Sequence, residues 1–406
     1  MTRRRLDLGD LGFDAGAHML VRHSLAQLDE GETLDVHGSH PELSLHLKAW
    51  CRARAVRCDT AGSPDAADRP VAVLTGTSGG RLPARARGAK RAGEASASSP
   101  DAVRPYAPAT WGLAPRGALV EAGVPPFDFD LAERDVVWAD ETAAIYAQAA
   151  AAQWDPATAI DWSAPFMLPD EVEDAVVQIM TYLIENETAA LVIPARFAAR
   201  IHPHFREVIQ VLAIQAADEA RHVEVFTRRA LMRRPSLGLS TAGGQTSLKT
   251  LLDEPDFALA SFLLSVLGEG SFLALLWFLQ QHAPDPVTRQ VARLAAQDEA
   301  RHVAFGLAHL RRHVSIDPRL RGRMTAAMER RHDALRDTAG LNEEVFDSLV
   351  LLAAGSWEPD AIRAGHRMVQ GLQDDMDRGR RSRLVKLGYP EEEAARLSAL
   401  HTRNFM

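Results

Sequence analysis

The residues best suited to chemistry lie in two nearly identical blocks, Ala216-Ala-Asp-Glu-Ala-Arg-His-Val223 and Ala296-Gln-Asp-Glu-Ala-Arg-His-Val303, offset by 80 residues (216 to 296). Each block contains Glu-x-x-His and follows a long apolar stretch with an embedded glutamate. Glu187 precedes the first block's glutamate by 32 residues (187 to 219), and Glu269 precedes the second by 30 residues (269 to 299). Carboxylates and imidazoles are common metal ligands, so the repeat predicts a symmetric metal site.

Helical geometry directs these side chains to one place. Three residues along an α-helix correspond to about 300° of rotation, so the Glu and His of each block share a face, which is also the apolar face. Four carboxylates and two imidazoles in a core are prohibitive unless they are paired, protonated or bound to metal. Two divalent cations would neutralise four carboxylates, and this oxygen-rich set suits iron or manganese better than zinc. The six predicted ligands are Glu187, Glu219, His222, Glu269, Glu299 and His302.

Two alternatives concern these ligands. Glu185 and Glu187 lie about 200° apart on a helix and cannot both face the core. Glu187 continues an apolar stripe of its helix, so it is the predicted ligand. The non-metal interpretation of the whole set is a group of buried salt bridges with Arg221 and Arg301.

A third Glu-x-x-His, from Glu329 to His332, is not expected to bind metal. It lacks a preceding aspartate and a glutamate-bearing partner helix. It lies among several arginines, which is typical of a solvated helix face.

Three positions beside the predicted ligands have two interpretations. Pro194 removes a backbone donor and should kink its helix. Gly268 and Gly270 flank Glu269. All three either leave room beside the metals for oxygen or substrate, or permit close helix packing.

The elements that must position these residues are helices. After about residue 130 the pattern is helical, and the stretch 257–279 is long enough to cross a membrane. Glu269 at its midpoint would be costly in lipid, so a buried bundle helix is the preferred interpretation. The prediction is an all-α bundle over 130–315 with additional helices over 316–406. The helices are expected over 131–153, 169–202, 205–232, 255–282, 286–314, 318–338, 343–354, 359–379 and 390–402.

Residues 1–77 predict a separate small α/β domain. Alternating apolar residues and helical stripes give the order βαβαββ. The strands are expected at 5–8, 33–37, 56–58 and 71–74, and the helices at 15–28 and 41–53. Residues 78–129 begin with a stretch rich in Gly, Ser, Ala, Pro and Arg and are predicted to be a disordered linker.

The paired Asp-Glu-Ala-Arg-His blocks with their upstream glutamates resemble the ferritin-like di-iron carboxylate superfamily. That superfamily includes ribonucleotide reductase small subunits, multicomponent monooxygenases, acyl-carrier-protein desaturases and arylamine N-oxygenases. The resemblance covers roughly residues 130–315 and implies that Glu219 and Glu299 bridge the two metals. It also implies that Asp218 and Asp298 accept hydrogen bonds that orient the ligand imidazoles.

This resemblance implies an O2-dependent oxidoreductase of the oxygenase, N-oxygenase or desaturase type, acting on a small organic substrate. Its cofactor would be two iron ions, with Fe/Mn or Mn possible, and O2 would be a co-substrate. Abundant alanine and the presence of only four lysines suggest a bacterial chain, and we expect a role in specialised metabolism. The alternatives are an iron-oxidising storage protein and a non-catalytic interaction protein in which metal stabilises the bundle.

The N-terminal domain resembles the TusA/SirA sulfur-carrier fold in segments such as Leu6-Asp-Leu8 and Leu47-Lys-Ala-Trp-Cys-Arg52. Where that family places Cys-Pro-x-Pro, this chain has Asp14, Ala15, Gly16 and Ala17. The nucleophilic thiolate is absent, so sulfur transfer is not expected. Asp14 is predicted to cap the first helix, and Cys51 and Cys58 are predicted to be structural.

Composition restricts the partners. A net charge of −8 and a pI near 6.0 argue against nucleic acid. The N-terminus lacks the apolar region of an export signal, and we expect a cytoplasmic protein without membrane contact. No dinucleotide-binding fingerprint or ferredoxin-type cysteine cluster is present, so electrons would come from a separate donor or the substrate. A homodimer is compatible with these features.

Overall fold

The computed structural model divides into two compact units, which we describe separately. One consists of Met1–Ala92 with Gly117–Pro125, and the other of Gly93–Arg116 with Pro126–Met406. The structure describes residues 3–29, 31–54, 56–60, 70–75, 89–94, 102–335 and 343–400.

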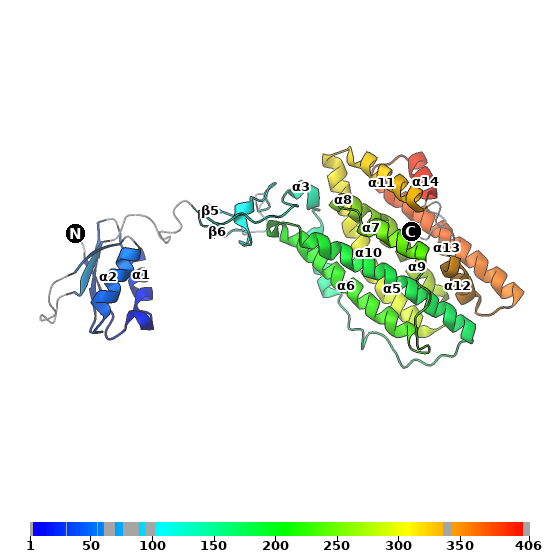
Figure 1. Ribbon diagram of the computed structural model, residues 1–406, viewed down its shortest axis with the longest axis horizontal. Helices are drawn as coiled ribbons and strands as arrows, with labels where there is room; N and C mark the ends of the chain where they lie inside the picture. Colours follow the sequence, from blue (N-terminus) through cyan, green and yellow to red (C-terminus); the bar gives the residue numbers. More distant parts are fainter. Residues whose placement is uncertain are drawn as a thin grey trace. The chain divides into compact units, whose positions relative to one another are not determined.

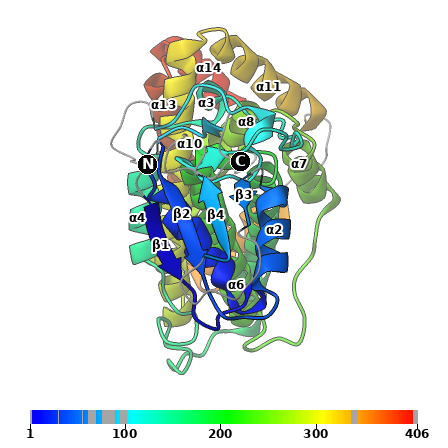
Figure 2. The ribbon, with the colours of Figure 1, turned by 90° about the vertical axis from the view of Figure 1, so that its left-hand side faces the viewer.

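The N-terminal unit contains a four-stranded sheet with the strand order β1-β2-β4-β3 (Figure 2). β1 and β2 are parallel, whereas β4 runs antiparallel to both of its neighbours. The observed order βαβαββ confirms the sequence prediction. The elements are β1 (Arg3–Asp7), α1 (Ala17–Ala26), β2 (Thr33–His37), α2 (Leu43–Ala53), β3 (Arg57–Asp59) and β4 (Ala72–Thr75).

Alternation along the strands gives this unit its own core. Leu34 and Val36 of β2 are buried with Leu74 of β4 against Val21 of α1 and Leu47 of α2. Both helices lie on the same face of the sheet (Figure 1). The apolar residues occupy every second position of a strand, so they lie on the one face of the sheet that the helices cover. The similarity to sulfur carriers stays a prediction.

The predicted cap at Asp14 is wrong. Asp14 lies inside a one-turn 3-10 helix, Phe13–Ala15, and the residue that precedes α1 is Gly16 with φ 106°. Gly16 adopts this left-handed conformation without the steric cost of a side chain, so the chain turns there instead. Cys51 is buried and free, and burial raises the pKa of its thiol to about 12.

The disordered linker predicted over 78–129 is wrong for residues 102–129, which are ordered. Trp111 of the short helix Ala109–Trp111 packs with buried Ala107 against the helical core, and the Ala107 amide donates to the Ala132 carbonyl (2.9 Å). β5 (Lys90–Arg91) and β6 (Leu119–Val120) form a two-stranded antiparallel sheet in the N-terminal unit. The segment has few apolar residues, and a few buried contacts with the bundle are enough to order it. Composition alone therefore could not reveal this order. Residues 78–88 and 95–101 lie outside the described residues.

Four long helical segments form the centre of the second unit (Figure 1). α5 packs along α6, and α9 packs along α10, which also contacts α6. The helix predicted over 131–153 is divided, because Trp138 between its two parts has extended backbone (φ −84°, ψ 147°). The four are α5 (Asp170–Ala198), α6 (Arg206–Ala230), α10 (Pro286–Ile316), and the continuous run of α8 (Phe257–Ser261), a π-helical segment (Phe262–Glu269) and α9 (Gly270–His282). The two parts of the divided helix are α3 (Arg134–Val137) and α4 (Thr142–Ala151).

The π-helical segment interrupts the helix predicted over 255–282. A π-helix widens the turn and is frequent at functional sites. The Arg383 side chain donates Nε to the Val266 carbonyl within it (2.6 Å). The sequence there is apolar on all sides, so its periodicity could not reveal the wider turn.

The remaining helices surround this centre. α7 (Ala242–Leu252) was not predicted; it begins at Thr241, whose hydroxyl accepts from the Gly244 amide (3.0 Å). α12 packs on α5 and α13, and α13 packs on α9. The others are α11 (Leu320–Leu335), α12 (Glu343–Ala354), α13 (Pro359–Lys386) and α14 (Glu391–Ala399).

Two described helices are long and apolar enough to cross a membrane by length and composition, Asp170–Ala198 and Phe257–His282. In their most apolar windows, 61% and 78% of the residues are buried inside the protein. Burial of this extent is typical of core helices in a large bundle.

Candidate metal centre

The six predicted ligand side chains come together between the four central helical segments. Each is buried, with no more than 4% of its surface exposed. α5 carries Glu187, the π-helical segment ends at Glu269, and α6 and α10 each contribute one Glu-His pair. Their ligand atoms form two overlapping groups in which all atoms lie within 4.8 Å of one another: Glu187, Glu219, His222 and Glu299, and Glu219, Glu269, Glu299 and His302. Glu219 and Glu299 belong to both groups, as bridging ligands would.

Both imidazoles direct Nδ1 toward the carboxylates. His222 Nδ1 lies 3.1 Å from Glu219 Oε2, 3.4 Å from Glu299 Oε1 and 3.6 Å from Glu187 Oε2. His302 Nδ1 lies 3.0 Å from Glu219 Oε1 and 3.5 Å from Glu299 Oε2. Two nitrogens and several oxygens therefore converge on one small volume.

The donor atoms fit a pair of divalent metal ions. Among the described residues, four buried carboxylate oxygens of the cluster have no hydrogen-bond partner: Glu187 Oε1, Glu269 Oε2 and both oxygens of Glu299. Unpaired polar atoms inside a protein are costly and call for an explanation such as a bound ion. Two divalent cations would supply the missing partners and neutralise the four carboxylates.

Asp218 and Asp298 contact the Nε2 atoms of the two imidazoles, on the side away from the carboxylate cluster. His222 Nε2 lies 3.1 Å from Asp298 Oδ2, and His302 Nε2 lies 3.2 Å from Asp218 Oδ2. Each imidazole thus contacts the aspartate of the other block. Because an ionised carboxylate can only accept, Nε2 carries a proton, and Nδ1 is the nitrogen that faces the cluster and would bind a metal.

Arg221 and Arg301 contact these aspartates rather than the glutamates. Arg221 Nη2 donates to Asp218 and to Asp298 Oδ2 (2.9 Å). Arg301 Nη2 donates to Asp298 and lies 3.9 Å from Asp218. The salt-bridge alternative therefore describes the aspartates, and it leaves the unpaired glutamate oxygens unexplained.

Two further residues that the sequence analysis missed complete this network. Gln153 Nε2 donates to Asp218 Oδ1 (2.8 Å), and Trp154 Nε1 donates to Asp298 Oδ2 (2.8 Å). Both follow the end of α4. Trp154 is 144 residues from Asp298, and no motif links them, so the sequence contains no signal for this contact.

The cluster strongly perturbs its own acidities. Burial, together with the charges of Glu219 and Glu299, raises the pKa of Glu187 well above its usual value. Burial and the Glu299 charge likewise raise the pKa of Glu269. Burial opposes protonation of His222 and His302, but the neighbouring carboxylates raise the pKa of both imidazoles. Protons therefore balance this cluster without metal, and metal would replace them.

The structure distinguishes the predicted ligands from the other candidate positions. Glu185 is only partly buried and is absent from both ligand groups, whereas Glu187 is buried in one of them. The half-exposed Glu329 pairs with Arg396 (3.0 Å). Glu329 and His332 are likewise absent from the two ligand groups. Pro194 is buried inside α5, and the kink expected there stays a prediction.

The two glycines beside Glu269 have different surroundings. A Cβ added to Gly270 would lie 2.4 Å from Arg383 Cζ, so this glycine permits close packing of α13. A Cβ on Gly268 would meet only the Leu263 carbonyl at 3.4 Å. Gly268 instead lines a cavity.

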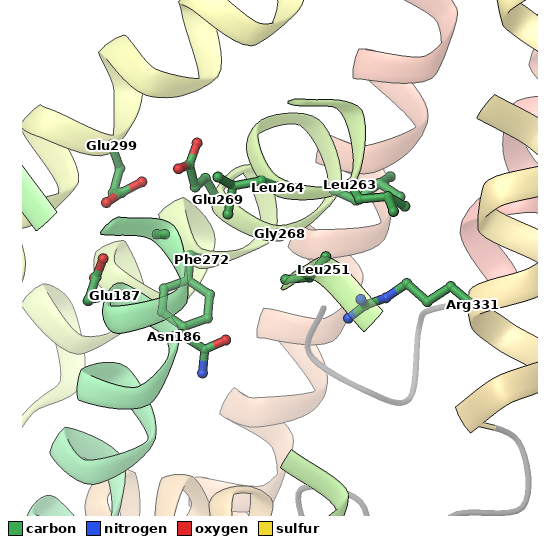
Figure 3. Close-up of a pocket in the computed structure, with 12 residues that line it drawn as sticks. Asn186, Glu187, Leu251, Leu263, Leu264, Gly268, Glu269, Phe272, Glu299 and Arg331 are labelled. Atoms are coloured by element: carbon green, nitrogen blue, oxygen red, sulfur yellow. The ribbon is translucent and has the colours of Figure 1, made fainter. Parts of the chain in front are cut away.

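This cavity adjoins the cluster (Figure 3). Most of its lining residues are apolar. Glu187, Glu269 and Glu299 line one part of it, so a molecule in the cavity would reach the carboxylates. The other lining residues are Asn186, Ala190, Leu251, Leu263, Leu264, Leu267, Gly268, Phe272 and Arg331.

No protein family and no curated protein matches the sequence. Two variants of an R2-like ligand-binding oxidase with anaerobically reconstituted Mn/Fe cofactor align at TM-score 0.45, with 19% and 20% identity, over 59% of this chain and 92% of theirs. The same oxidase with aerobically reconstituted metal cofactor after photoconversion aligns at TM-score 0.42 and 18% identity, over 64% of this chain and 90% of that one. Similarity at this level assigns neither fold nor function to this chain.

Proposed function

We propose that this protein is an O2-dependent oxidoreductase with a dinuclear metal centre that oxidises a small organic substrate. The metals would be two iron ions, or iron with manganese, held by the six side chains of the cluster. Specialised metabolism in a bacterium is the proposed setting. The reaction would be of the oxygenase, N-oxygenase or desaturase type.

The observation that carries this proposal is the apolar cavity beside Glu187, Glu269 and Glu299. Storage of iron requires a polar route along which many ions travel. An apolar cavity instead suits an organic molecule and excludes water from the reacting atoms. The cavity therefore favours substrate oxidation over the storage alternative, and a metal that only stabilised the bundle would need no such space.

The chain's own residues would have three tasks. Two bound divalent metal ions would supply electrons for the reduction of O2. The four glutamates would balance the metal charge, and Asp218 and Asp298 would keep each imidazole Nδ1 directed at the cluster. The apolar lining would hold the substrate beside the carboxylates, while a separate electron donor would restore the reduced state.

The test is anaerobic loading with Fe(II) followed by exposure to O2. We expect two iron ions per chain, consumption of on the order of one O2 per site, and full retention of the iron. Elemental analysis and an oxygen electrode give these quantities. The Glu187→Ala variant should lose the reaction, and Glu185→Ala is the matched control on the same helix.

Excess Fe(II) distinguishes the alternatives. Sustained iron oxidation with a growing ferric core would favour storage and overturn the proposal. Bound Fe(II) that never reacts with O2, even with candidate substrates present, would favour a structural metal.

A further inference from the structure

The cavity beside the cluster has two chemically different ends. Glu187, Glu269 and Glu299 lie at one end, and the Arg331 side chain extends from α11 toward Leu251 at the other (Figure 3). Leucines and Phe272 line the space between them. A molecule that fills this space meets a cation at one end, an apolar wall along its length, and the cluster at the other end.

Arg331 is a buried and oriented cation. Only 6% of its surface is exposed. Its Nη2 donates to Ser247 Oγ (2.8 Å), and its Nη1 donates to the Ser247 carbonyl (3.2 Å) and to Thr250 Oγ1. Burial lowers its pKa to about 10, so the guanidinium remains charged at neutral pH. These contacts on α7 fix the plane of the guanidinium beside the cavity.

The buried Tyr182 hydroxyl is close enough to Arg331 for the positive charge to affect its pKa. Tyr182 Oη has no hydrogen-bond partner among the described residues, and the residue is 4% exposed. Burial raises the pKa of Tyr182, and the positive charge of Arg331 opposes that rise.

Resting on the proposed function, we propose that the cavity binds a monocarboxylate with an apolar body, whose carboxylate pairs with Arg331 and whose remote end lies beside Glu187, Glu269 and Glu299. The planar guanidinium matches a planar carboxylate and forms charge-assisted hydrogen bonds with it. An amine at the same place would be repelled by Arg331. The apolar lining favours a hydrocarbon chain or ring over a polar body.

This orientation determines which part of the substrate is near the cluster. The carboxylate lies at the far end of the cavity, so the atoms most remote from it approach Glu187, Glu269 and Glu299. A ligand carboxylate bound at the cluster itself would have the opposite orientation. The two arrangements differ in their dependence on Arg331.

Calorimetry of the full chain tests the proposal without turnover. The protein is loaded with Mn(II) under argon and titrated with hexanoate, hexan-1-ol and hexylamine. We expect hexanoate to bind at least tenfold more tightly than either other probe. Arg331→Gln should reduce hexanoate affinity at least tenfold while leaving metal content unchanged. Arg330→Gln is the matched control, because Arg330 is exposed and adjacent on the same helix.

A second variant covers the case in which Arg331→Gln fails to fold. Leu251→Trp adds a large side chain at the Arg331 end of the cavity and retains Arg331 itself, so hexanoate binding should be lost. Equal binding of hexanoate and hexan-1-ol, undiminished hexanoate binding in Arg331→Gln, or undiminished binding in Leu251→Trp would each overturn the proposal. Because no O2 is present, failure here differs from failure of the proposed oxidation, which the Fe(II) and O2 experiment reports.

Discussion

At the residue scale, the metal centre depends on which side of a helix each carboxylate occupies. Glu185 and Glu187 are two positions apart on α5, yet Glu187 is buried in the cluster while Glu185 is partly exposed. Glu187→Ala removes one carboxylate from a set of six ligands, so the variant should bind substantially less metal. Glu185→Ala should keep about two metal ions per chain. Elemental analysis after dialysis measures both, and full metal content in Glu187→Ala would refute the ligand assignment.

The aspartates behind the imidazoles should tune metal affinity without touching the metal. Asp298 accepts hydrogen bonds from His222 Nε2, Arg221 Nη2 and Trp154 Nε1. Asp298→Asn keeps the shape but removes the charge that orients the imidazole, so metal affinity should fall by about 10–100-fold. Competition with a chelator measures this change. Asp253→Asn, at an exposed helix end, is the control, and equal affinities in both variants would contradict the orienting role.

At the scale of elements, the junction between the π-helical segment and α9 depends on Gly270. A Cβ there would lie 2.4 Å from Arg383 Cζ, and Arg383 Nε donates to the Val266 carbonyl. Gly270→Ala should therefore reduce the free energy of unfolding by about 1–3 kcal/mol through overpacking. Gly268→Ala, which adds its Cβ beside the cavity, should change it by less than about 1 kcal/mol. Urea denaturation measures both.

A double-mutant cycle distinguishes the cause of that effect. If the clash with the guanidinium is responsible, Gly270→Ala should cost less in an Arg383→Met background. An equal cost in both backgrounds would assign the effect to the backbone of the π-helical segment instead.

The segment before α3 is held to the bundle by a buried ion pair that should be acid-sensitive. Arg116 donates to both Glu207 oxygens (3.0 and 2.6 Å) and to the His204 carbonyl (2.6 Å). Glu207→Gln should lower the free energy of unfolding by about 3–5 kcal/mol, because it leaves the Arg116 charge buried and unpaired. Arg206→Gln, which removes a more exposed contact to the same carboxylate, should cost less than about 1 kcal/mol. Chemical denaturation at pH 7 compares them.

The pH dependence of this contact has a definite sign. Burial, followed by the charge of Arg116, lowers the pKa of His204 from 6.5 to about 4. The contribution of neutral His204 to the free energy of unfolding is therefore complete above about pH 6.5 and falls progressively as the pH drops toward 4. Burial alone would raise the pKa of Glu207, but the hydrogen bond and charge of Arg116 lower it below 4.5. The contribution of Glu207 to the free energy of unfolding is therefore present above pH 4.5 and is lost as the pH falls through the pKa of the folded state. Denaturation midpoints of the wild type and Glu207→Gln should therefore fall together between pH 6.5 and 4.5, where both proteins lose the His204 contribution, and should converge only below pH 4.5. A constant difference below pH 4.5 would contradict the assignment.

At the scale of the whole molecule, the two units have separate hydrophobic cores. The core of the N-terminal unit is made from residues 8–74, and no ligand of the cluster lies in that unit. A chain that begins at residue 89 should therefore bind the same number of metal ions as the full chain. Elemental analysis of the two chains tests this. Loss of metal from the shorter, folded chain would show that the bundle needs the N-terminal unit.

The N-terminal unit should not accept persulfide sulfur. If the predicted similarity to sulfur carriers holds, Asp14 stands where they place their cysteine. Burial raises the pKa of the Cys51 thiol to about 12. Burial also raises the pKa of Cys58. Both thiols are therefore protonated at neutral pH and poorly nucleophilic. Mass spectrometry after incubation with a persulfide donor should show no added sulfur.

The sequence by itself determined the convergence of the six ligand residues. Glu-x-x-His has a defined geometry on a helix, and its repetition with two upstream glutamates in apolar stretches leaves few ways to bury the charge. The same local periodicity predicted the βαβαββ order, because alternation and helical stripes are properties of neighbouring residues. Patterns of this kind need no knowledge of the rest of the chain.

Only the tertiary structure decided the features that join distant parts of the chain. The crossing of each imidazole to the aspartate of the other block, the contacts of Trp154 and Gln153, and the placement of Arg331 at the end of the cavity join residues more than 60 positions apart. The ordered segment around Arg116 and the π-helical turn before Gly270 likewise depend on partners from other elements. Such contacts form where separate helices pack, and no local periodicity records which helices those are.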